Sequence, residues 1–144
     1  MQDATAKAAI GTHVNVTVTL FDFPYLVCPQ CGSKAMVNAE APAEVLFPLT
    51  KAISYATARG FRTKLWSCAA CNGPIDPSLE RNETFSVPLS LQGTYQFLAQ
   101  LTMPAATCGA CGRIQVTANE RALNSDIADA LIAAFDSFGP YYQW

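Results

Sequence analysis

Strict alternation of apolar and polar residues predicts three β-strands in this chain, because successive side chains of a strand point to opposite faces. The first strand covers residues 13–21, and its apolar face consists of Val14, Val16, Val18 and Leu20. The other two cover residues 85–91 and 95–101, with Gln92-Gly93-Thr94 between them as a hairpin turn. Pro88 lacks a backbone N–H, so the first strand of this hairpin is expected at a sheet edge or at a bulge.

The clearest helix is predicted over residues 125–138. Its apolar residues recur three and four positions apart, which gives one continuous apolar face: Ile127, Ala130, Leu131, Ala134, Phe135 and Phe138. Asn124 or Ser125 is expected to cap its first turn, and Gly139-Pro140 to end it. The first turn would also carry acids that suit the positive end of the helix dipole: Asp126 and Asp129.

A second, mid-chain helix is predicted over residues 49–59, immediately before Gly60. Its apolar residues at helical spacing are Leu49, Ala52, Ile53 and Ala56. Pro42 and Pro48 predict a loop or a short irregular element in front of it. The aromatic tail, residues 141–144, is expected to pack on this chain or on a partner.

The composition indicates a subunit that associates with other protein chains. Of the 144 residues, 51% are apolar and only 14% are charged, against about 25% charged in typical soluble domains. The net charge of −2 argues against general binding of nucleic acid, which depends on neutralising phosphates. Residues 1–12 contain no continuous apolar run, so we expect no signal peptide or membrane span, and synthesis in the cytoplasm with reduced thiols.

All six cysteines occur in Cys-x-x-Cys pairs whose first members are forty residues apart: Cys28 and Cys31, Cys68 and Cys71, and Cys108 and Cys111. Such a turn places two thiolates where one tetrahedral metal can take both. The residue after each pair, which commonly needs a positive φ, is Gly32, Asn72 or Gly112. Short strands are expected to flank the turns: 35–37, 61–66, and 113–117 with Ile114 and Val116 inward.

Two of these turns, Cys28-Pro29-Gln30-Cys31-Gly32 and Cys108-Gly109-Ala110-Cys111-Gly112, resemble the knuckles of zinc-ribbon and zinc-knuckle proteins. The resemblance implies that two knuckles, one from each of two hairpins, bind one structural Zn²⁺. Because four ligands complete a site, three pairs leave one pair over, and the sequence leaves open which two share the metal. The remaining pair could bind a second metal with His13, meet its counterpart in a homodimer, or stay metal-free as a dithiol or disulfide.

Other chemistry is sparse. His13 is the only histidine, and Asp76, Glu80 and Glu83 lie in a turn-rich stretch that is typical of a solvated loop. Iron, an iron–sulfur cluster or disulfides would use the same cysteines, whereas a thioredoxin-like centre would need a βαβ context. A strip beside the second knuckle could bind nucleic acid by charge and stacking, although a strand with alternating charged and buried faces explains it better: Arg59, Phe61, Arg62, Lys64 and Trp66.

We therefore expect a single α+β domain over residues 1–144, built mostly from antiparallel hairpins with knuckle turns, one mid-chain helix and a C-terminal amphipathic helix. The expected function is non-enzymatic. The chain would be a zinc-stapled structural or assembly subunit that binds protein partners or copies of itself, for example within a virus or phage virion. The alternatives are a zinc-ribbon module for nucleic acid or transcription, and a thiol–disulfide redox protein or disulfide-locked subunit.

Overall fold

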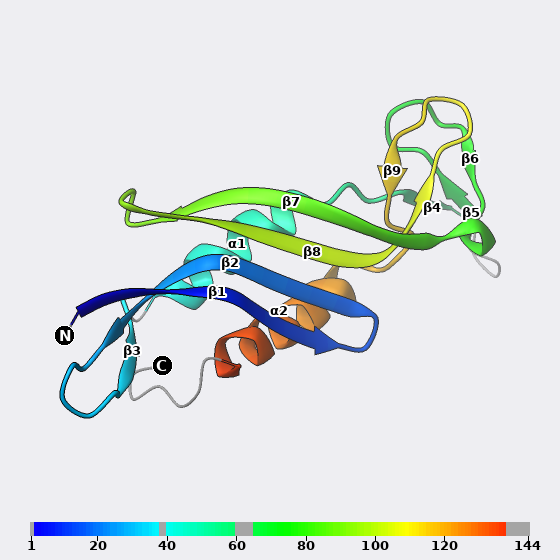
Figure 1. Cartoon of the computed structure of the whole chain (residues 1–144). Coiled ribbons are helices and arrows are strands. Elements are labelled where there is room, and N and C mark those ends of the chain that lie inside the picture. The colour runs from blue at the N-terminus through cyan, green and yellow to red at the C-terminus, as the bar shows by residue number, and fades with distance from the viewer. Residues whose placement is uncertain (1, 38–39, 60–64, 138–144) are drawn as a thin grey trace.

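The main sheet of the protein is antiparallel, with two helices against it, as seen in a computed structural model that describes residues 2–37, 40–59 and 65–137 (Figure 1). Its long strands lie in the order β1 (Gln2–His13), β2 (Val16–Val27), β8 (Tyr95–Thr107) and β7 (Arg81–Leu91). Two short strands extend it: β3 (Lys34–Met36) beside β2, and β9 (Ile114–Gln115) beside β8. The helices are α1 (Ala41–Lys51) and α2 (Glu120–Asp136), and neither is long and apolar enough to cross a membrane. The α+β prediction is confirmed.

A second, smaller sheet lies at one end of the main sheet (Figure 1). It contains β4 (Thr57–Arg59), β5 (Leu65–Ser67) and β6 (Pro74–Ile75), and a 3₁₀ turn, η1 (Pro77–Leu79), follows it. Asp76 begins that turn, because its carboxylate accepts a hydrogen bond from the Ser78 N–H. The hairpin of β2 and β3 lies at the opposite end of the molecule (Figure 1).

The core lies between the main sheet and the helices, as the alternation predicts. Every second residue of β8 from Phe97 to Ala105 is buried, and the predicted apolar positions of α2 within the described residues are buried against the sheet. Phe23 of β2 joins the two layers: its ring lies 5.1 Å from that of Phe97 and 5.2 Å from that of Phe135. The predicted hairpin of residues 85–101 is confirmed, with Pro88 in the edge strand β7.

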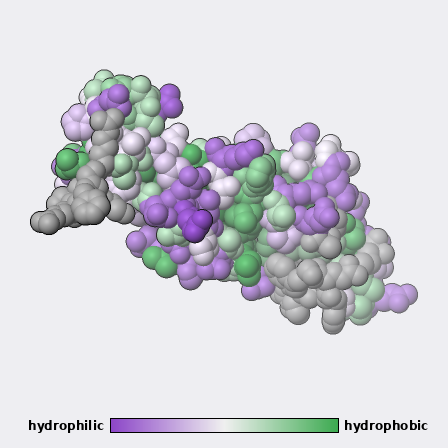
Figure 2. Space-filling model, turned by 180° about the vertical axis from the view of Figure 1, so that it is seen from behind, coloured by the Kyte–Doolittle hydropathy of each residue, from purple (hydrophilic) through white to green (hydrophobic). Residues whose placement is uncertain are grey.

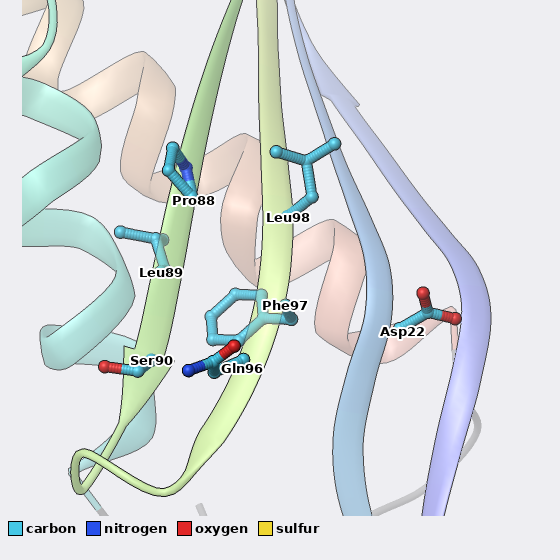
Figure 3. A pocket seen from close by; sticks show the side chains of 7 residues that line it. All are labelled: Asp22, Pro88, Leu89, Ser90, Gln96, Phe97 and Leu98. Carbon is cyan, nitrogen blue, oxygen red and sulfur yellow. The ribbon is translucent and has the colours of Figure 1, made fainter.

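The main sheet opens between β2 and β8 halfway along its length. The two strands pair only as far as Phe21 and Leu98, and Asp22, at φ +57°, then turns β2 away. Figure 3 shows the strands diverging there, around a cavity lined by Asp22, Pro88, Leu89, Ser90, Gln96, Phe97 and Leu98. Beyond the opening β3 takes the place of β8 beside β2, from Tyr25 to Val27. The first cysteine turn therefore projects from a hairpin that has left the neighbouring strand.

The prediction for residues 13–21 was partly wrong. The strand begins at Val16, because Val14 and Asn15 form a two-residue loop in which Val14 has φ +56° and is 68% exposed. The strand before that loop, β1, was missed entirely. Four of its twelve residues are alanine and Ile10 is its only large apolar residue, so no alternation of large apolar side chains marks it. A residue without a side chain is needed at Gly11, because the backbone of α2 lies against β1 there.

The mid-chain helix was predicted in the wrong place. It covers Ala41–Lys51, and the segment predicted as its second half contains the strand β4 instead. Pro42 is tolerated because the N–H groups of a first helical turn have no partner within the helix, and Pro48 lies inside the helix. Its buried face consists of Ala41, Val45 and Leu49. Gly60 and residues 61–64 lie outside the described residues, and only β5 represents the strand predicted over 61–66.

The C-terminal helix begins five residues earlier than predicted, at Glu120. Its cap is Asn119, whose side chain accepts a hydrogen bond from the Ala122 N–H, so the predicted caps Asn124 and Ser125 were wrong. Asp126 and Asp129 consequently lie within the helix, and their carboxylates are 3.6 and 3.4 Å from the His13 imidazole. Phe138, Gly139-Pro140 and the aromatic tail lie outside the described residues.

Replacing Gly11 with alanine tests the close packing of β1 on α2. A Cβ atom at Gly11 would lie 2.1 Å from the Ala130 carbonyl oxygen and 2.2 Å from the Ala134 nitrogen, both in the helix backbone. We expect Gly11→Ala to lower the free energy of unfolding by about 1–3 kcal/mol in denaturant titrations, because backbone must move to accommodate the methyl group. Gly109→Ala is the control, since a Cβ there meets nothing within 4 Å. Equal unfolding midpoints for the two variants would contradict the packing described.

Candidate metal centre

All three cysteine turns have the same backbone conformation, hereafter called a knuckle. In each, the N–H of the first cysteine donates to the carbonyl five residues later, at 2.8, 2.8 and 2.9 Å. The residue after the second cysteine donates back to the carbonyl of the first, at 2.9, 2.9 and 2.8 Å. That residue has a positive φ in every case: Gly32 +74°, Asn72 +61° and Gly112 +77°. The predicted turn chemistry is therefore confirmed at all three knuckles.

The fold brings the second and third knuckles together. The β5–β6 hairpin carries Cys68 and Cys71, the β8–β9 hairpin carries Cys108 and Cys111, and all four Sγ atoms lie within 4.8 Å of one another. Cys68 Sγ is 3.6 Å from Cys111 Sγ, and Cys71 Sγ is 3.5 Å from Cys108 Sγ. Thiolates bound tetrahedrally at about 2.3 Å would be about 3.8 Å apart. These four cysteines are thus positioned to bind a metal ion.

The first knuckle lies apart from this cluster, at the opposite end of the molecule (Figure 1). Among the residues that the structure describes, Cys28 and Cys31 belong to no group of three or more possible metal ligands. Ser33 hydrogen-bonds to Cys31, with Oγ 3.0 Å from Sγ, and its hydroxyl and N–H lower the pKa of the Cys31 thiol to about 7. The close sequence likeness of the first and third knuckles therefore did not identify the two that meet.

The second and third knuckles bury their inner sulfurs against each other. Cys68 and Cys108 are 0% and 1% exposed, whereas the second cysteine of each knuckle is exposed. Gly73 lies at this contact: a Cβ there would be a tight 3.3 Å from Cys71 Sγ in its own knuckle and in ordinary contact, at 3.5 Å, with Cys108 Sγ. A small apolar cluster surrounds the inner sulfurs and includes Ala56, Ile75 and Ala106, with Trp66 packed against it.

Gln115 links the two knuckles through its side-chain amide. It lies on β9, is fully buried, accepts a hydrogen bond from the Ala69 N–H at 2.9 Å, and donates one to Cys68 Sγ at 2.9 Å. The sequence had suggested Ile114 and Val116 as the inward residues; Val116 is buried, but Ile114 is only partly buried. Gln115 was missed because a glutamine that alternates with apolar residues suggests a solvent-facing position, and only the second knuckle provides its partners.

Hydrogen bonds distribute charge unequally over the four sulfurs. The backbone N–H of Cys71 and then the Gln115 amide lower the pKa of Cys68 to about 6. The backbone N–H groups of Cys111 and Ala110 likewise lower the pKa of Cys108. Although the Gly73 N–H acts in the opposite direction, hydrogen bonds with Cys108 and Cys68 raise the pKa of Cys71 to about 12. The hydrogen bonds therefore lower the pKa of the two buried thiols, Cys68 and Cys108, and raise that of the exposed Cys71.

Comparison with known proteins does not place the chain in a family. No protein-family model matches it, and no curated protein or solved structure matches it either. The likeness to zinc-ribbon knuckles therefore depends on the turns themselves. The four-cysteine geometry identifies a candidate metal centre without naming a family.

Gln115→Ala tests the amide link between the knuckles. Loss of the hydrogen bond to Cys68 should weaken metal affinity roughly 10- to 100-fold in chelator competition, because partners of metal ligands fix their orientation and charge. Gln96→Ala is the matched control. Gln96 is exposed at the start of β8, and the third knuckle follows the opposite end of that strand. Unchanged affinity for Gln115→Ala, or an equal loss for Gln96→Ala, would contradict the role of this amide.

The raised pKa of Cys71 predicts that metal binding still releases protons at pH 9, where an ordinary thiol is already half ionised. A group whose pKa is about 12 remains protonated there, so the metal must displace that proton. For the same reason affinity should fall as the pH falls. Calorimetric titrations in two buffers of different ionisation enthalpy measure the number of protons released. Identical binding heats in both buffers at pH 9 would contradict the prediction.

Proposed function

We propose that Cys68, Cys71, Cys108 and Cys111 bind one structural Zn²⁺, and that the protein is a non-enzymatic structural or assembly subunit. The observation that carries the proposal is the closed set of four sulfurs, two of them buried. Structural zinc sites have four protein ligands, whereas catalytic sites keep one position for water or substrate. Tetrahedral thiolate sets suit zinc, and an iron-loaded protein would differ by its visible absorption.

The proposed zinc would act as a local staple, because the region around it has little core of its own. The apolar cluster beside the inner sulfurs contains five buried residues, two of which are cysteines. The main core, by contrast, contains no cysteine and includes all the large side chains of β2, β8 and α2 that are fully buried. Thiolate–metal bonds would fix two hairpins that hydrophobic burial alone holds weakly.

The assembly role is supported by the surface. Large apolar side chains are exposed on several elements: Ile10, Val14, Phe47, Leu65, Leu79 and Ile132. Figure 2 shows hydrophobic side chains gathered near the middle of the face seen from behind the sheet. With only 14% charged residues, this surface offers little repulsion against association. A particle such as a virion is one setting in which such a subunit would serve.

Hydrogen exchange before and after removal of the metal tests the staple. We expect chelation to accelerate exchange of the amides in β5, β6 and β9, because the knuckles lose their common ligand, while β8 around Leu101 and the middle of α2 keep their protection. The Cys28→Ser/Cys31→Ser variant is the control and should respond as the native chain does. Exchange that is unchanged by chelation would contradict a structural role for the metal, and uniform loss of protection would contradict a local one.

A further inference from the structure

The first knuckle has the full backbone geometry of half a metal site. Its two characteristic hydrogen bonds, Cys28 N–H to Ser33 and Gly32 N–H to Cys28, have the same lengths within 0.1 Å as those of the knuckles that meet. The Ser33 hydroxyl contacts Cys31 Sγ, where the Gly73 N–H contacts Cys71 Sγ in the second knuckle. Both thiols are thus presented as a ligand pair, in a turn that no other chemistry in the described residues explains.

The described part of this chain does not supply the other two ligands that a metal bound to Cys28 and Cys31 would need. Cys28 is only partly buried and Cys31 is exposed, whereas Cys68 and Cys108 are covered by the knuckle opposite them. His13 ends β1 beside Val16, at the other end of β2 from this knuckle and up to about 36 Å away at the usual rise of a strand, and it contacts acids of α2. The hairpin that bears Cys28 and Cys31 has also diverged from β8, so its tip is open to a partner.

The cluster of Cys68, Cys71, Cys108 and Cys111 indicates which kind of partner could supply those ligands. Its close contacts are reciprocal: the first cysteine of each knuckle approaches the second cysteine of the other, at 3.6 and 3.5 Å. Reciprocal contacts of this kind are those that a two-fold axis produces between two like turns. A knuckle of this geometry therefore completes a tetrahedral site with a copy of itself, which is what a two-fold symmetric dimer provides.

We propose that Cys28 and Cys31 bind a second Zn²⁺ together with Cys28 and Cys31 of a second copy of the chain, so that the metal joins two subunits. The choice of zinc rests on the proposed function, whereas the choice of partner rests on the knuckle geometry. Binding releases the thiol protons to solvent and leaves a Zn²⁺ with four thiolates, which carries a net charge of −2. Lys34 lies three residues after Cys31, with its Nζ 5.5 Å from the centre of the Tyr25 ring.

Metal content and molecular mass, measured together on protein purified with a non-thiol reductant and no chelator, test this proposal. The native chain should be a dimer by light scattering and contain about 1.5 zinc ions per chain, one from the intrachain cluster and half of a shared one. Cys28→Ser/Cys31→Ser should be a monomer with about one zinc. Cys31→Ser alone should give the same result, and since Cys31 is exposed this variant is expected to fold. Gln30→Ala, in the same turn but not a ligand, should remain dimeric.

The two proposals fail in different ways. A native monomer with one zinc, a dimer that persists in the double variant, or a Cys28–Cys31 disulfide found by thiol counting would overturn the shared site and leave the intrachain staple intact. Absence of zinc from the folded double variant would instead overturn the intrachain staple, whatever the oligomeric state of the native chain.

Discussion

The contact between the second and third knuckles organises the end of the protein that carries the smaller sheet. Four sulfur atoms lie within 4.8 Å of one another, and four thiolates at that separation repel strongly unless a cation lies among them. Backbone N–H groups and Gln115 lower the pKa of the buried thiols, whereas neighbouring cysteines raise the pKa of Cys71. A cation bound by all four thiolates would neutralise that repulsion and link the two hairpins.

The fold separates two sources of stability. The main sheet and its helices bury a core of aromatic and aliphatic side chains around Phe23, Leu101 and Phe135 that includes no cysteine. The knuckles lie at the two ends of the molecule, on hairpins that project from the main sheet (Figure 1). One end carries two knuckles that complete each other, and the other carries one, which leaves a ligand pair available to another subunit.

Local features were predictable from the sequence, whereas pairing between distant segments was not. The positive φ at Gly32, Asn72 and Gly112 and the alternation along β8 follow from individual residues and their immediate neighbours. The strand β1 was missed because it has no alternation of large apolar residues, and the need for glycine at Gly11 comes from α2, which is more than a hundred positions away in the chain. The choice of the second and third knuckles, and the burial of Gln115, depend on how β5, β6 and β9 come together, and no local pattern encodes that.

Zinc K-edge X-ray absorption of the Cys28→Ser/Cys31→Ser variant tests the central claim most directly. The cysteines that remain in this variant are the four of the cluster, so sulfur ligands can come only from them. The account predicts a coordination shell of four sulfurs at about 2.3 Å, with no nitrogen or oxygen ligand. A shell that includes nitrogen or oxygen, or a folded variant that contains no zinc, would contradict it.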